Sequence, residues 1–485
     1  MNEKITDQKV LNATKWSTFA ELMAKLATPI VNMVLARLLT PEVFGVIASI
    51  TIITSFADIF TDAGFQRFII QHDYQNADDL DKETNVAFWS NLILSIIIYL
   101  SIFSFRKSLA KFVGCPKEYI GISVAGLSVI CTTFSSSATA RFKRDMNFKS
   151  LFFVRIASSF LPFLVTIPLA IVLKSYWAII VGTLSQQIVT AVLLTTISKW
   201  KPKFYFSFPT LKAMLPFSLW NLAETLSIWF AGQAGIFIVS NALSQYYVGL
   251  YKTSMSTVNS YMSLITASIS SVLFSTLSRY KEDEYCFKKV VYSFIKGVSI
   301  IIVPMGVGMF LYRDLVVKIL LGTQWCEAAF FVGLWALFST ITITFSNIAS
   351  EVYRSTGKPV ISFILQLGFL LVYIPVIVWG AKQGYKTLCY VSCFIRILPV
   401  ALDIIMMVVK YNISIHKMFI AVTPTMVSVA VMTALALFLK AFGDAVWWQF
   451  VSIVLCIVLY FTCTLIFKSN RELFRTLKLK QGEQQ

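Results

Sequence analysis

The sequence has little charge, little histidine and no long polar segment. Asp, Glu, Lys and Arg make up 14% of its 485 residues, and it contains two histidines. Two histidines give little support to a histidine proton relay or a zinc site. The longest connection between apolar stretches, 64–84, has about 21 residues, which leaves no room for an extramembrane catalytic or binding domain.

Motifs for chemistry on a substrate are missing as well. We find no Ser/His/Asp set, no glycine-rich phosphate loop and no DxD-type metal motif at a plausible site. The eight cysteines show no metal-ligand spacing, and Cys389 and Cys393 are simply one helical turn apart. The sequence therefore predicts neither an enzyme nor a protein with a bound metal or organic cofactor.

Apolar stretches of membrane-spanning length fill the chain instead. A transmembrane helix needs about 20 residues, and 57% of the residues are hydrophobic. We therefore predict an all-α integral membrane protein with about 14 transmembrane helices. The expected spans are 14–37, 43–63, 85–104, 119–140, 151–173, 177–197, 214–239, 249–275, 289–311, 327–349, 359–379, 387–409, 418–439 and 446–467.

Two short segments suggest that the chain contains an internal repeat. Residues 38–46 resemble residues 242–250, and Gly45 matches Gly249 at an offset of 204 residues, which is about six spans. Such an offset predicts two parallel six-helix lobes. We expect an N-terminal lobe at 1–198, a cytoplasmic linker at 199–212, a C-terminal lobe at 213–410, and spans 13 and 14 with a tail at 411–485.

Polar residues follow one face of two equivalent helices. They are Thr51, Ser55, Asp58 and Asp62 on span 2, and Lys252, Ser256, Asn259 and Ser263 on span 8. One interpretation is that both stripes line a wet cavity between the lobes, because unsatisfied polar groups are costly in hydrocarbon. The alternative is that the hydroxyls bond back to their own helices. Asp58, Asn259 and Lys252 fit this alternative less well.

Several charged residues fall inside predicted spans. A charge at the bilayer centre costs about 2.5–3.5 kcal/mol even on lenient scales, so these side chains are expected to face the protein interior. Lys25, Lys296 and Arg396 suit an anionic ligand, although Glu21 could neutralise Lys25 along one helix face. Arg155 lies one turn into its span and can snorkel to the surface. The acidic residues away from the span ends are Glu21, Asp58, Glu224 and Asp403.

Basic residues predict the orientation. We assign 26 Lys and Arg residues to the side of the N-terminus and 12 to the opposite side, so the positive-inside rule places both termini in the cytoplasm. The net charge of +18 is spread over short loops. This pattern favours contact with anionic membrane lipids rather than with nucleic acid.

Short motifs spread over nearly the whole chain resemble the Wzx-type flippases. This family is the polysaccharide-transport branch of the multidrug/oligosaccharidyl-lipid/polysaccharide (MOP) exporter superfamily, and the likeness is to colanic and teichuronic acid exporters. The resemblance implies two six-helix bundles around a central cavity, with two helices appended. The motifs are 38–45, 62–65 with 69–71, 144–149, 273–274 with 277–279, and 357–359.

The resemblance also implies a substrate, an oligosaccharide carried on undecaprenyl pyrophosphate in the bacterial cytoplasmic (inner) membrane. Lys25 is the best-placed cation for the pyrophosphate in the first lobe. Its counterpart in the second lobe falls near Trp229, which is not basic, so Lys252 or Lys296 would take that role. Arg396 and Asn259 complete the predicted substrate-binding set. A polysaccharide polymerase or another assembly protein is the expected protein partner.

A proton or sodium ion could drive such an exporter, and Glu21, Asp58 and Glu224 are the candidates to carry it. An anion moving out of a negative cytoplasm does not require coupling, because it gains about 2.3 kcal/mol per charge per 100 mV. Two alternatives remain. A cation-coupled multidrug exporter should have an acidic, aromatic cavity, and a membrane polymerase or ligase should have a large outer loop.

Overall fold

The computed structural model describes most of the chain as helix. It covers residues 16, 23, 25–62, 65–72, 74, 76–358, 360–467 and 470–471. Every regular element in these ranges is helical. The chain forms two compact units, Met1–Lys252 and Thr253–Gln485, which are described separately below.

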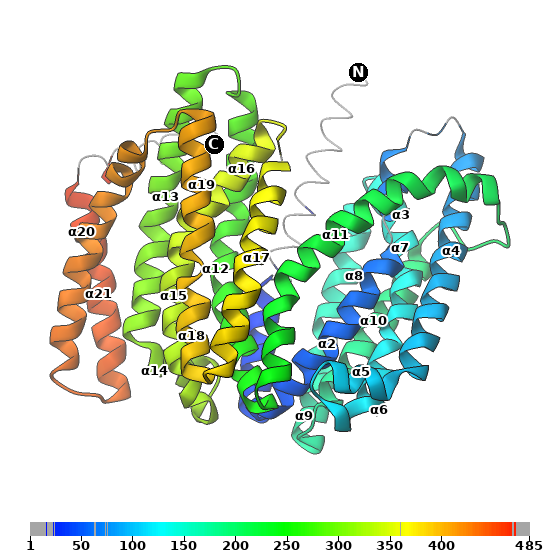
Figure 1. Cartoon of the computed structure of the whole chain (residues 1–485), viewed down its shortest axis with the longest axis horizontal. Helices are drawn as coiled ribbons and strands as arrows, with labels where there is room; N and C mark the ends of the chain where they lie inside the picture. The colour runs from blue at the N-terminus through cyan, green and yellow to red at the C-terminus, as the bar shows by residue number, and fades with distance from the viewer. Residues whose placement is uncertain are drawn as a thin grey trace. The chain divides into compact units, whose positions relative to one another are not determined.

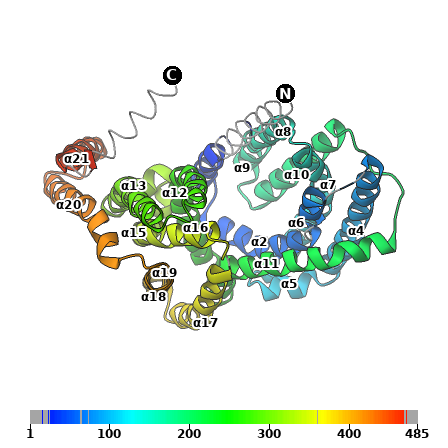
Figure 2. The ribbon, with the colours of Figure 1, turned by 90° about the horizontal axis from the view of Figure 1, so that it is seen from above.

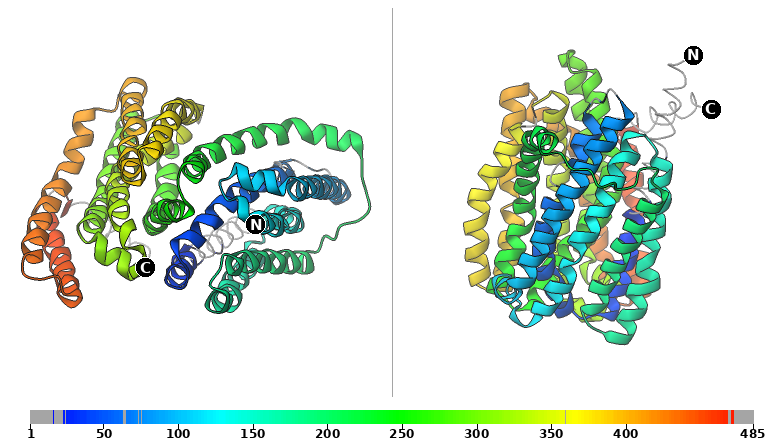
Figure 3. Two further views of the ribbon diagram at one scale, coloured as in Figure 1. Left: turned by 60° about the horizontal axis from the view of Figure 1, so that its bottom comes forward. Right: turned by 90° about the vertical axis from the view of Figure 1, so that its right-hand side faces the viewer.

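The first unit is a bundle of long helices with one oblique helix laid across it. Residues 25–38 form its first described helix. The last helix, α11, runs obliquely across α2, α3 and α4 (Figure 1), while the other long helices lie roughly side by side (Figure 3). The elements are α2 (Pro41–Asp62), α3 (Phe65–Gln71), α4 (Ala77–Ser104), α5 (Arg106–Phe112), η1 (Pro116–Glu118), α6 (Tyr119–Gly126), α7 (Ser128–Arg144), α8 (Phe148–Leu161), η2 (Pro162–Thr166), α9 (Ile167–Leu173), α10 (Trp177–Ile197) and α11 (Phe208–Ala242).

Two of the motifs that carry the family resemblance meet in this unit. The Arg144 guanidinium donates to the backbone oxygens of Ile69 at 2.8 Å and His72 at 2.7 Å, and it stacks on the Tyr74 ring at 4.4 Å. It thereby satisfies carbonyls at the end of α3, which a helix leaves unpaired. Asn147, three residues later, caps α8 by accepting from the Ser150 N–H.

The second unit packs around α13. Its buried apolar residues join α13 to α16, α19 and α20, and α15 packs against α13 as well. Figure 2 shows α20 and α21 paired at one margin of this unit. Its elements are α12 (Gln245–Arg279, which begins in the first unit), α13 (Glu284–Leu311), α14 (Arg313–Leu320), η3 (Thr323–Ala328), α15 (Ala329–Thr342), η4 (Ile343–Asn347), α16 (Ile348–Ser355), α17 (Val360–Lys382), α18 (Tyr385–Phe394), α19 (Ile397–Tyr411), α20 (Ile415–Lys440) and α21 (Val446–Ile466).

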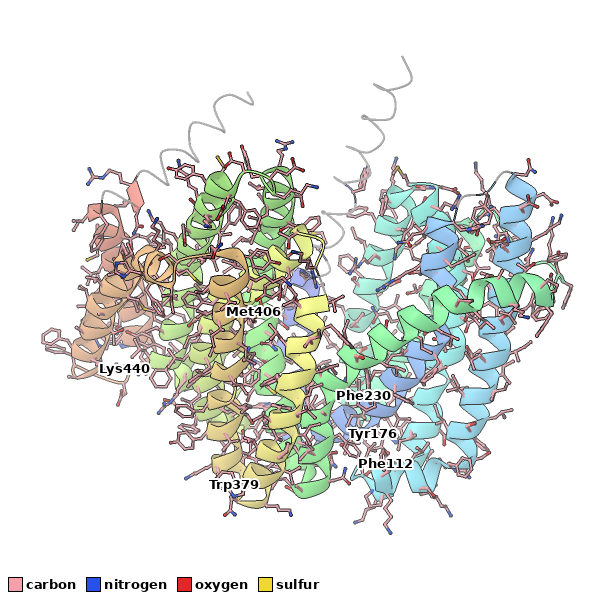
Figure 4. The ribbon with its side chains drawn as sticks, turned by 45° about the horizontal axis from the view of Figure 1, so that its top comes forward. Phe112, Tyr176, Phe230, Trp379, Met406 and Lys440 are labelled. Atoms are coloured by element: carbon pink, nitrogen blue, oxygen red, sulfur yellow. The ribbon has the colours of Figure 1, made fainter. Side chains whose placement is uncertain are left out.

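A lysine side chain links the ends of two helices in the second unit. Lys440, labelled in Figure 4, donates from its ammonium to the Leu311 carbonyl and lies 5.1 Å from the centre of the Tyr312 ring. The last turn of α20 is thereby tied to the end of α13. The favourable interaction of a cation with helix C-terminal carbonyls explains the contact.

The predicted fold class is confirmed. Among the described residues, 11 helices are long and apolar enough to cross a membrane. Each of them overlaps one predicted span. Residues 25–38, α11 and α12 are also helical and lie where the other three spans were predicted. The division into lobes at 199–212 stays a prediction.

Candidate functional site

A cavity of about 640 Å³ opens among the helices of the first unit. Its volume falls within the range of about 300–1,000 Å³ that is typical of ligand sites. Its wall is built by residues 25–38, α7, α8, η2 and α10, all in the same unit. Polar side chains supply much of the wall: Thr28, Asn32, Thr139, Lys143, Arg155, Ser158, Ser159, Thr166, Thr183, Gln186 and Thr190.

The cavity carries positive charge. Lys143 and Arg155 line it, whereas no Asp or Glu belongs to the lining in the described part of the chain. The Lys143 ammonium also donates to the Gln66 side-chain oxygen at 3.2 Å. A wall of hydroxyls, amides and two cations can hydrogen-bond a polyhydroxylated ligand and neutralise an anionic one.

Neither cation was in the predicted site. Arg155 is expected to snorkel, and Lys143 lies between the predicted spans 119–140 and 151–173, among the 26 basic residues assigned to the side of the N-terminus. The pattern that could have found the cavity is on span 5, where Arg155, Ser158, Ser159, Pro162 and Thr166 follow one helical face. The structure places all five of them in the wall.

The cavity lies beside an irregular turn. Residues Pro162–Thr166 form one π-helical turn, with Pro162 at its start, and such bulges are frequent at functional sites. Gly182 of α10 packs against this turn so closely that a Cβ there would lie 1.9 Å from the Thr166 hydroxyl oxygen. Glycine at 182 is therefore required for the contact between η2 and α10 that forms this wall.

The predicted residues of the first unit are spread over several helices. Lys25 precedes the cavity residue Thr28 by about one turn on the helix at 25–38. Lys252 lies half-buried on α12. Glu21 falls outside the described residues, and Glu224 belongs to α11, but its side chain is not among those described.

The span 2 stripe contacts α11 at Ser55, whereas Thr51 is exposed. The Thr51 hydroxyl donates to the Ile47 carbonyl and the Ser55 hydroxyl to the Thr51 carbonyl, so the alternative interpretation holds for both hydroxyls. Ser55 accepts a hydrogen bond from the Trp229 indole at 2.9 Å. Asp58 accepts from the Thr132 hydroxyl of α7 at 3.3 Å. The stripe therefore makes contacts with α7 and α11 within the unit.

In the second unit, the structure brings together two of the predicted substrate-binding residues through a tryptophan. The Arg396 guanidinium lies 4.1 Å from the centre of the Trp335 ring and donates to the Ser339 hydroxyl at 3.0 Å. The Trp335 indole N–H donates to the Asn259 side-chain oxygen at 3.1 Å. Lys296 is buried on α13, with 9% of its surface exposed.

The two glycines of the sequence repeat touch one another's helices. A Cβ on Gly45 would lie 1.8 Å from the Gln245 backbone oxygen, and a Cβ on Gly249 would lie 1.8 Å from the Pro41 backbone oxygen. The Ser49 hydroxyl bonds to the Gln245 side chain at 3.1 Å. Thus α2 and the start of α12 cross at backbone contact, which only glycine allows.

Residues 112–114, at the end of α5, contact the helices next to the same crossing. The Gln245 amide donates to the Gly114 carbonyl at 2.7 Å, and the Asn241 amide donates to the Phe112 carbonyl at 3.0 Å. Figure 4 labels Phe112 at this end of the unit. Gly114 has φ +74°, and a Cβ there would lie 1.9 Å from the Ser240 backbone oxygen. These contacts tie the end of α5 to α11 and to the start of α12.

Comparison with known proteins identifies the family. The model of a family described as "Polysaccharide biosynthesis protein" matches residues 34–330, more than half of the chain. The chain belongs to this family. Residues 34–330 include four of the five cavity-forming elements in full and the last turn of the helix at 25–38.

Curated relatives of this family member include a transport protein of polysaccharide biosynthesis. The chain is 21% identical over 351 residues to the succinoglycan biosynthesis transport protein ExoT of Rhizobium meliloti (strain 1021), covering 72% of this chain and 70% of ExoT. It is 21% identical over 384 residues to the lipopolysaccharide biosynthesis protein WzxC of Escherichia coli (strain K12), covering 78% and 76%. The predicted resemblance to Wzx-type flippases is confirmed.

Solved structures confirm the fold. The inward closed conformation of the lipid II flippase MurJ matches with a TM-score of 0.76 at 15% identity, over 94% of this chain and 99% of MurJ. An inward-facing multidrug resistance MATE transporter of the MOP superfamily matches with a TM-score of 0.57 at 15% identity, over 79% and 92%. The protein is therefore a multi-pass membrane transporter of polysaccharide biosynthesis with a MOP-type fold, and not an enzyme.

Proposed function

We propose that this transporter flips an undecaprenyl-pyrophosphate-linked oligosaccharide from the inner to the outer leaflet of the bacterial cytoplasmic membrane. Surface polysaccharide assembly is the process it serves, and a polymerase or another assembly protein is its partner. The polyprenyl tail stays in lipid, so only the polar head has to cross through protein. Both termini face the cytoplasm in this proposal.

The observation that carries the proposal is the chemistry of the cavity in the first unit. Eleven polar side chains line it, two of them are cations, and no carboxylate is among the described lining. Sugar hydroxyls both donate and accept hydrogen bonds, as do the threonine, serine, asparagine and glutamine side chains of the wall. Lys143 and Arg155 match the negative charge of a phosphate.

The same chemistry argues against export of cationic drugs. A cationic compound needs a carboxylate or an open aromatic face as its partner. The described lining offers neither kind of group, since its charged members are Lys143 and Arg155. The similarity to the MATE transporter is therefore one of fold. The side chains that line the cavity favour an anionic cargo.

Other cations extend this site in the proposal. Lys25 lies one turn from the cavity residue Thr28, and we assign it to the pyrophosphate together with Lys252 or Lys296. The predicted roles of Arg396 and Asn259 are tested separately, because in the second unit both contact Trp335. Glu21, Asp58 and Glu224 remain the candidates to carry a coupling proton or sodium ion, although outward movement of an anion is already favoured by about 2.3 kcal/mol per charge per 100 mV.

In a transporter that works by alternating access, the crossing of α2 and α12 at Gly45 and Gly249 can act as a gate. Gly45 and Gly249 are equivalent positions in the two predicted repeats, and α2 and α12 meet there at backbone contact. In two lobes related by a two-fold axis, a contact between equivalent residues lies on that axis. We propose that this crossing is the outer gate, which separates when the cavity opens outward.

Reconstitution tests the function. The purified protein is placed in vesicles that contain the lipid-linked oligosaccharide from its host, and outer-leaflet cargo is followed with an impermeant glycosidase. We expect Arg155→Ala and Lys143→Ala each to slow flipping about 10-fold or more, since a hydrogen bond to a charged group contributes about 1.5–3 kcal/mol. The exposed Lys199→Ala is the matched control. Equal flipping by empty vesicles and protein vesicles would contradict the proposal.

A crosslink tests the gate. Cysteines replace Ser49 and Gln245, whose side chains are 3.1 Å apart, in a variant without native cysteines, and a short bifunctional thiol reagent joins them. We expect the crosslink to stop flipping and a cleavable version to restore it on reduction. Undiminished flipping with the crosslink complete would place the gate elsewhere.

A further inference from the structure

The segment between α10 and α11 exposes aromatic rings and lysines together. Residues 199–212 contain four lysines and no Asp or Glu. Phe204, Phe206 and Phe208 have 95%, 51% and 67% of their surface exposed. Figure 1 and Figure 2 both show this segment at a margin of the first unit, beside α4. Apolar side chains gathered on a surface mark an interaction site.

Contacts with α4 fix the position of this segment. The Trp89 indole N–H donates to the Lys203 carbonyl at 2.8 Å, and its ring stacks on Phe204 with 4.8 Å between the ring centroids. The Asn85 side-chain oxygen accepts from the Lys203 N–H at 2.9 Å. Trp200, three residues earlier, is buried. The backbone at Lys203 is therefore held against α4, while the phenylalanines that follow it stay exposed.

These contacts lie where α4 changes from charged to apolar. Residues 78–83 contain five charged side chains, whereas residues 84–104 contain none. The helix from Asp78 to Ser104 is long and apolar enough to cross a membrane. Asn85 and Trp89 are near the start of its apolar part, so the segment lies at the depth where a membrane helix enters the bilayer. Aromatic rings are enriched at this boundary between lipid and water.

Two exposed lysines flank the exposed rings. Lys203 precedes Phe204, and Lys212 lies four residues after Phe208 on the same face of α11. Lys201 is engaged otherwise, because its ammonium donates to backbone carbonyls at the end of α10. Lys203 and Lys212 are therefore the cations that accompany the rings.

The acidic residues at the start of α4 have partners of their own. Asp78 pairs with Lys82 at 2.7 Å, and Asp81 pairs with Arg141 at 2.8 Å. In the described part of the chain, no carboxylate lies within ion-pair distance of the two lysines that flank the rings. Their positive charge is therefore available to a ligand outside the chain.

We propose that residues 203–212 bind the headgroups of anionic phospholipids in the leaflet at the start of α4. Lys203 and Lys212 pair with the lipid phosphates, and the three phenylalanine rings lie among the headgroups and the upper acyl chains. Anionic membrane surfaces attract lysines, and aromatic rings anchor a chain at the same depth. A lipid rather than a protein is the ligand, because Phe204 lies beside the apolar part of a membrane helix.

This surface holds the start of α11 to the bilayer. Phe208 and Lys212 belong to its first two turns, and Trp229 in its second half donates to Ser55 of α2. Asn241, in its last turn, donates to a carbonyl at the end of α5, next to the crossing of α2 and α12. Anionic lipid therefore restrains a helix whose other end contacts the proposed gate. That this restraint affects transport rests on the proposed function, whereas lipid binding does not.

Lipid contact is measured on the full-length protein without cargo. In a variant without native cysteines, Phe206→Cys carries a bimane fluorophore, and the protein is placed in vesicles of phosphatidylcholine and phosphatidylglycerol. One lipid at a time is brominated, so quenching reports which lipid contacts position 206. We expect both lipids to quench, and phosphatidylglycerol to bind at least about 5-fold more tightly. Lys203→Gln combined with Lys212→Gln should remove most of this preference, because it removes both charges.

Matched variants make the result specific. Lys203→Arg combined with Lys212→Arg keeps both charges and should keep the preference. Val454 is 58% exposed on α21, a helix without charged residues, so bimane on Val454→Cys should be quenched equally by the two lipids. If the double glutamine variant does not fold, salt at about 0.5 M replaces it, since screening should weaken the preference at position 206 and leave position 454 unchanged.

Two results would overturn the proposal. One is the absence of quenching at position 206, which is expected if water or a protein covers the segment, and the other is equal binding of the two lipids there. Flipping in vesicles with and without phosphatidylglycerol tests the effect on transport separately. We expect slower flipping without it. Equal flipping while the lipid preference is intact would overturn the role of the lipid in transport.

Discussion

The two units place the charged side chains of their membrane helices in different surroundings. In the first unit, Lys143 and Arg155 line a cavity of about 640 Å³. In the second unit, a pocket lined by α12, α13, η4 and α16 has a volume of about 10 Å³, which is no more than the space for one water molecule. Arg396 and Asp403 of the second unit contact neighbouring side chains instead.

Two charged side chains of the second unit pack against neighbouring residues. Arg396 stacks on Trp335 and bonds to Ser339, and the Tyr353 hydroxyl donates to the Asp403 carboxylate at 3.2 Å. Such contacts make a charge part of the protein core. An intramembrane charge therefore indicates a binding site only when free volume lies beside it.

The largest effect is expected at the crossing of α2 and α12. Gly45→Ala places a methyl group 1.8 Å from the Gln245 backbone oxygen, so α2 and α12 must separate. We expect a loss of more than about 3 kcal/mol in the free energy of unfolding, because neither backbone can yield locally. Unfolding in detergent, driven by SDS, measures it.

The control for this glycine is in the second unit. Gly297 lies within α13, and a Cβ there meets nothing within 4 Å. Gly297→Ala should stabilise the protein by about 0.5–1 kcal/mol, since alanine favours helix. Equal effects of the two substitutions would show that the crossing of α2 and α12 is not tight.

Removal of a packed cation should cost less than the glycine change but still be large. Arg396→Ala loses the ring contact with Trp335 and the hydrogen bond to Ser339, and we expect a destabilisation of about 2–4 kcal/mol. Arg396→Lys keeps the charge but not the planar stack, so it should recover part of this loss. If Arg396→Ala left the stability unchanged, Arg396 would not be part of the packed core of the second unit.

A smaller effect is expected for the hydroxyl that faces Asp403. Tyr353→Phe keeps the ring and removes the donor, which should destabilise the second unit by about 1–2 kcal/mol. Tyr390→Phe is the control, because Tyr390 is 46% exposed. The two variants are compared by thermal unfolding. Equal midpoints would show that the contact between Tyr353 and Asp403 does not stabilise the second unit.

The smallest effect on stability is expected in the cavity wall. Arg155 is exposed and lies beside free volume. Arg155→Ala should therefore change the free energy of unfolding by less than about 0.5 kcal/mol, while flipping falls. A destabilisation as large as that of Arg396→Ala would erase the difference between the units.

The sequence predicted what depends on periodicity and composition. Apolar runs located the spans, and the repeat around Gly45 and Gly249 pointed to two residues that the structure brings into contact. Arg396 and Asn259 were also noticed in the sequence, because each is a polar residue within an apolar predicted span. That both of them contact Trp335 could not be predicted, because the contact joins α12, α15 and the turn before α19.

The cavity could have been predicted only in part. The stripe from Arg155 to Thr166 is visible in the sequence, and it indicates a polar wall. Free volume, however, depends on how residues 25–38, α7 and α10 pack around that stripe. Volume is a property of several helices at once, so no single helix pattern reveals it.

Cysteine accessibility tests the central claim most directly, namely that the cavity of the first unit binds the cargo. In a variant without native cysteines, Thr183→Cys places a thiol in the cavity wall and Ser299→Cys places one in the packed second unit, where the side chain is fully buried. We expect a small thiol reagent to label position 183 and not 299, and purified lipid-linked oligosaccharide to slow that labelling at least 10-fold. Labelling of position 183 at the same rate with and without saturating cargo would contradict the account.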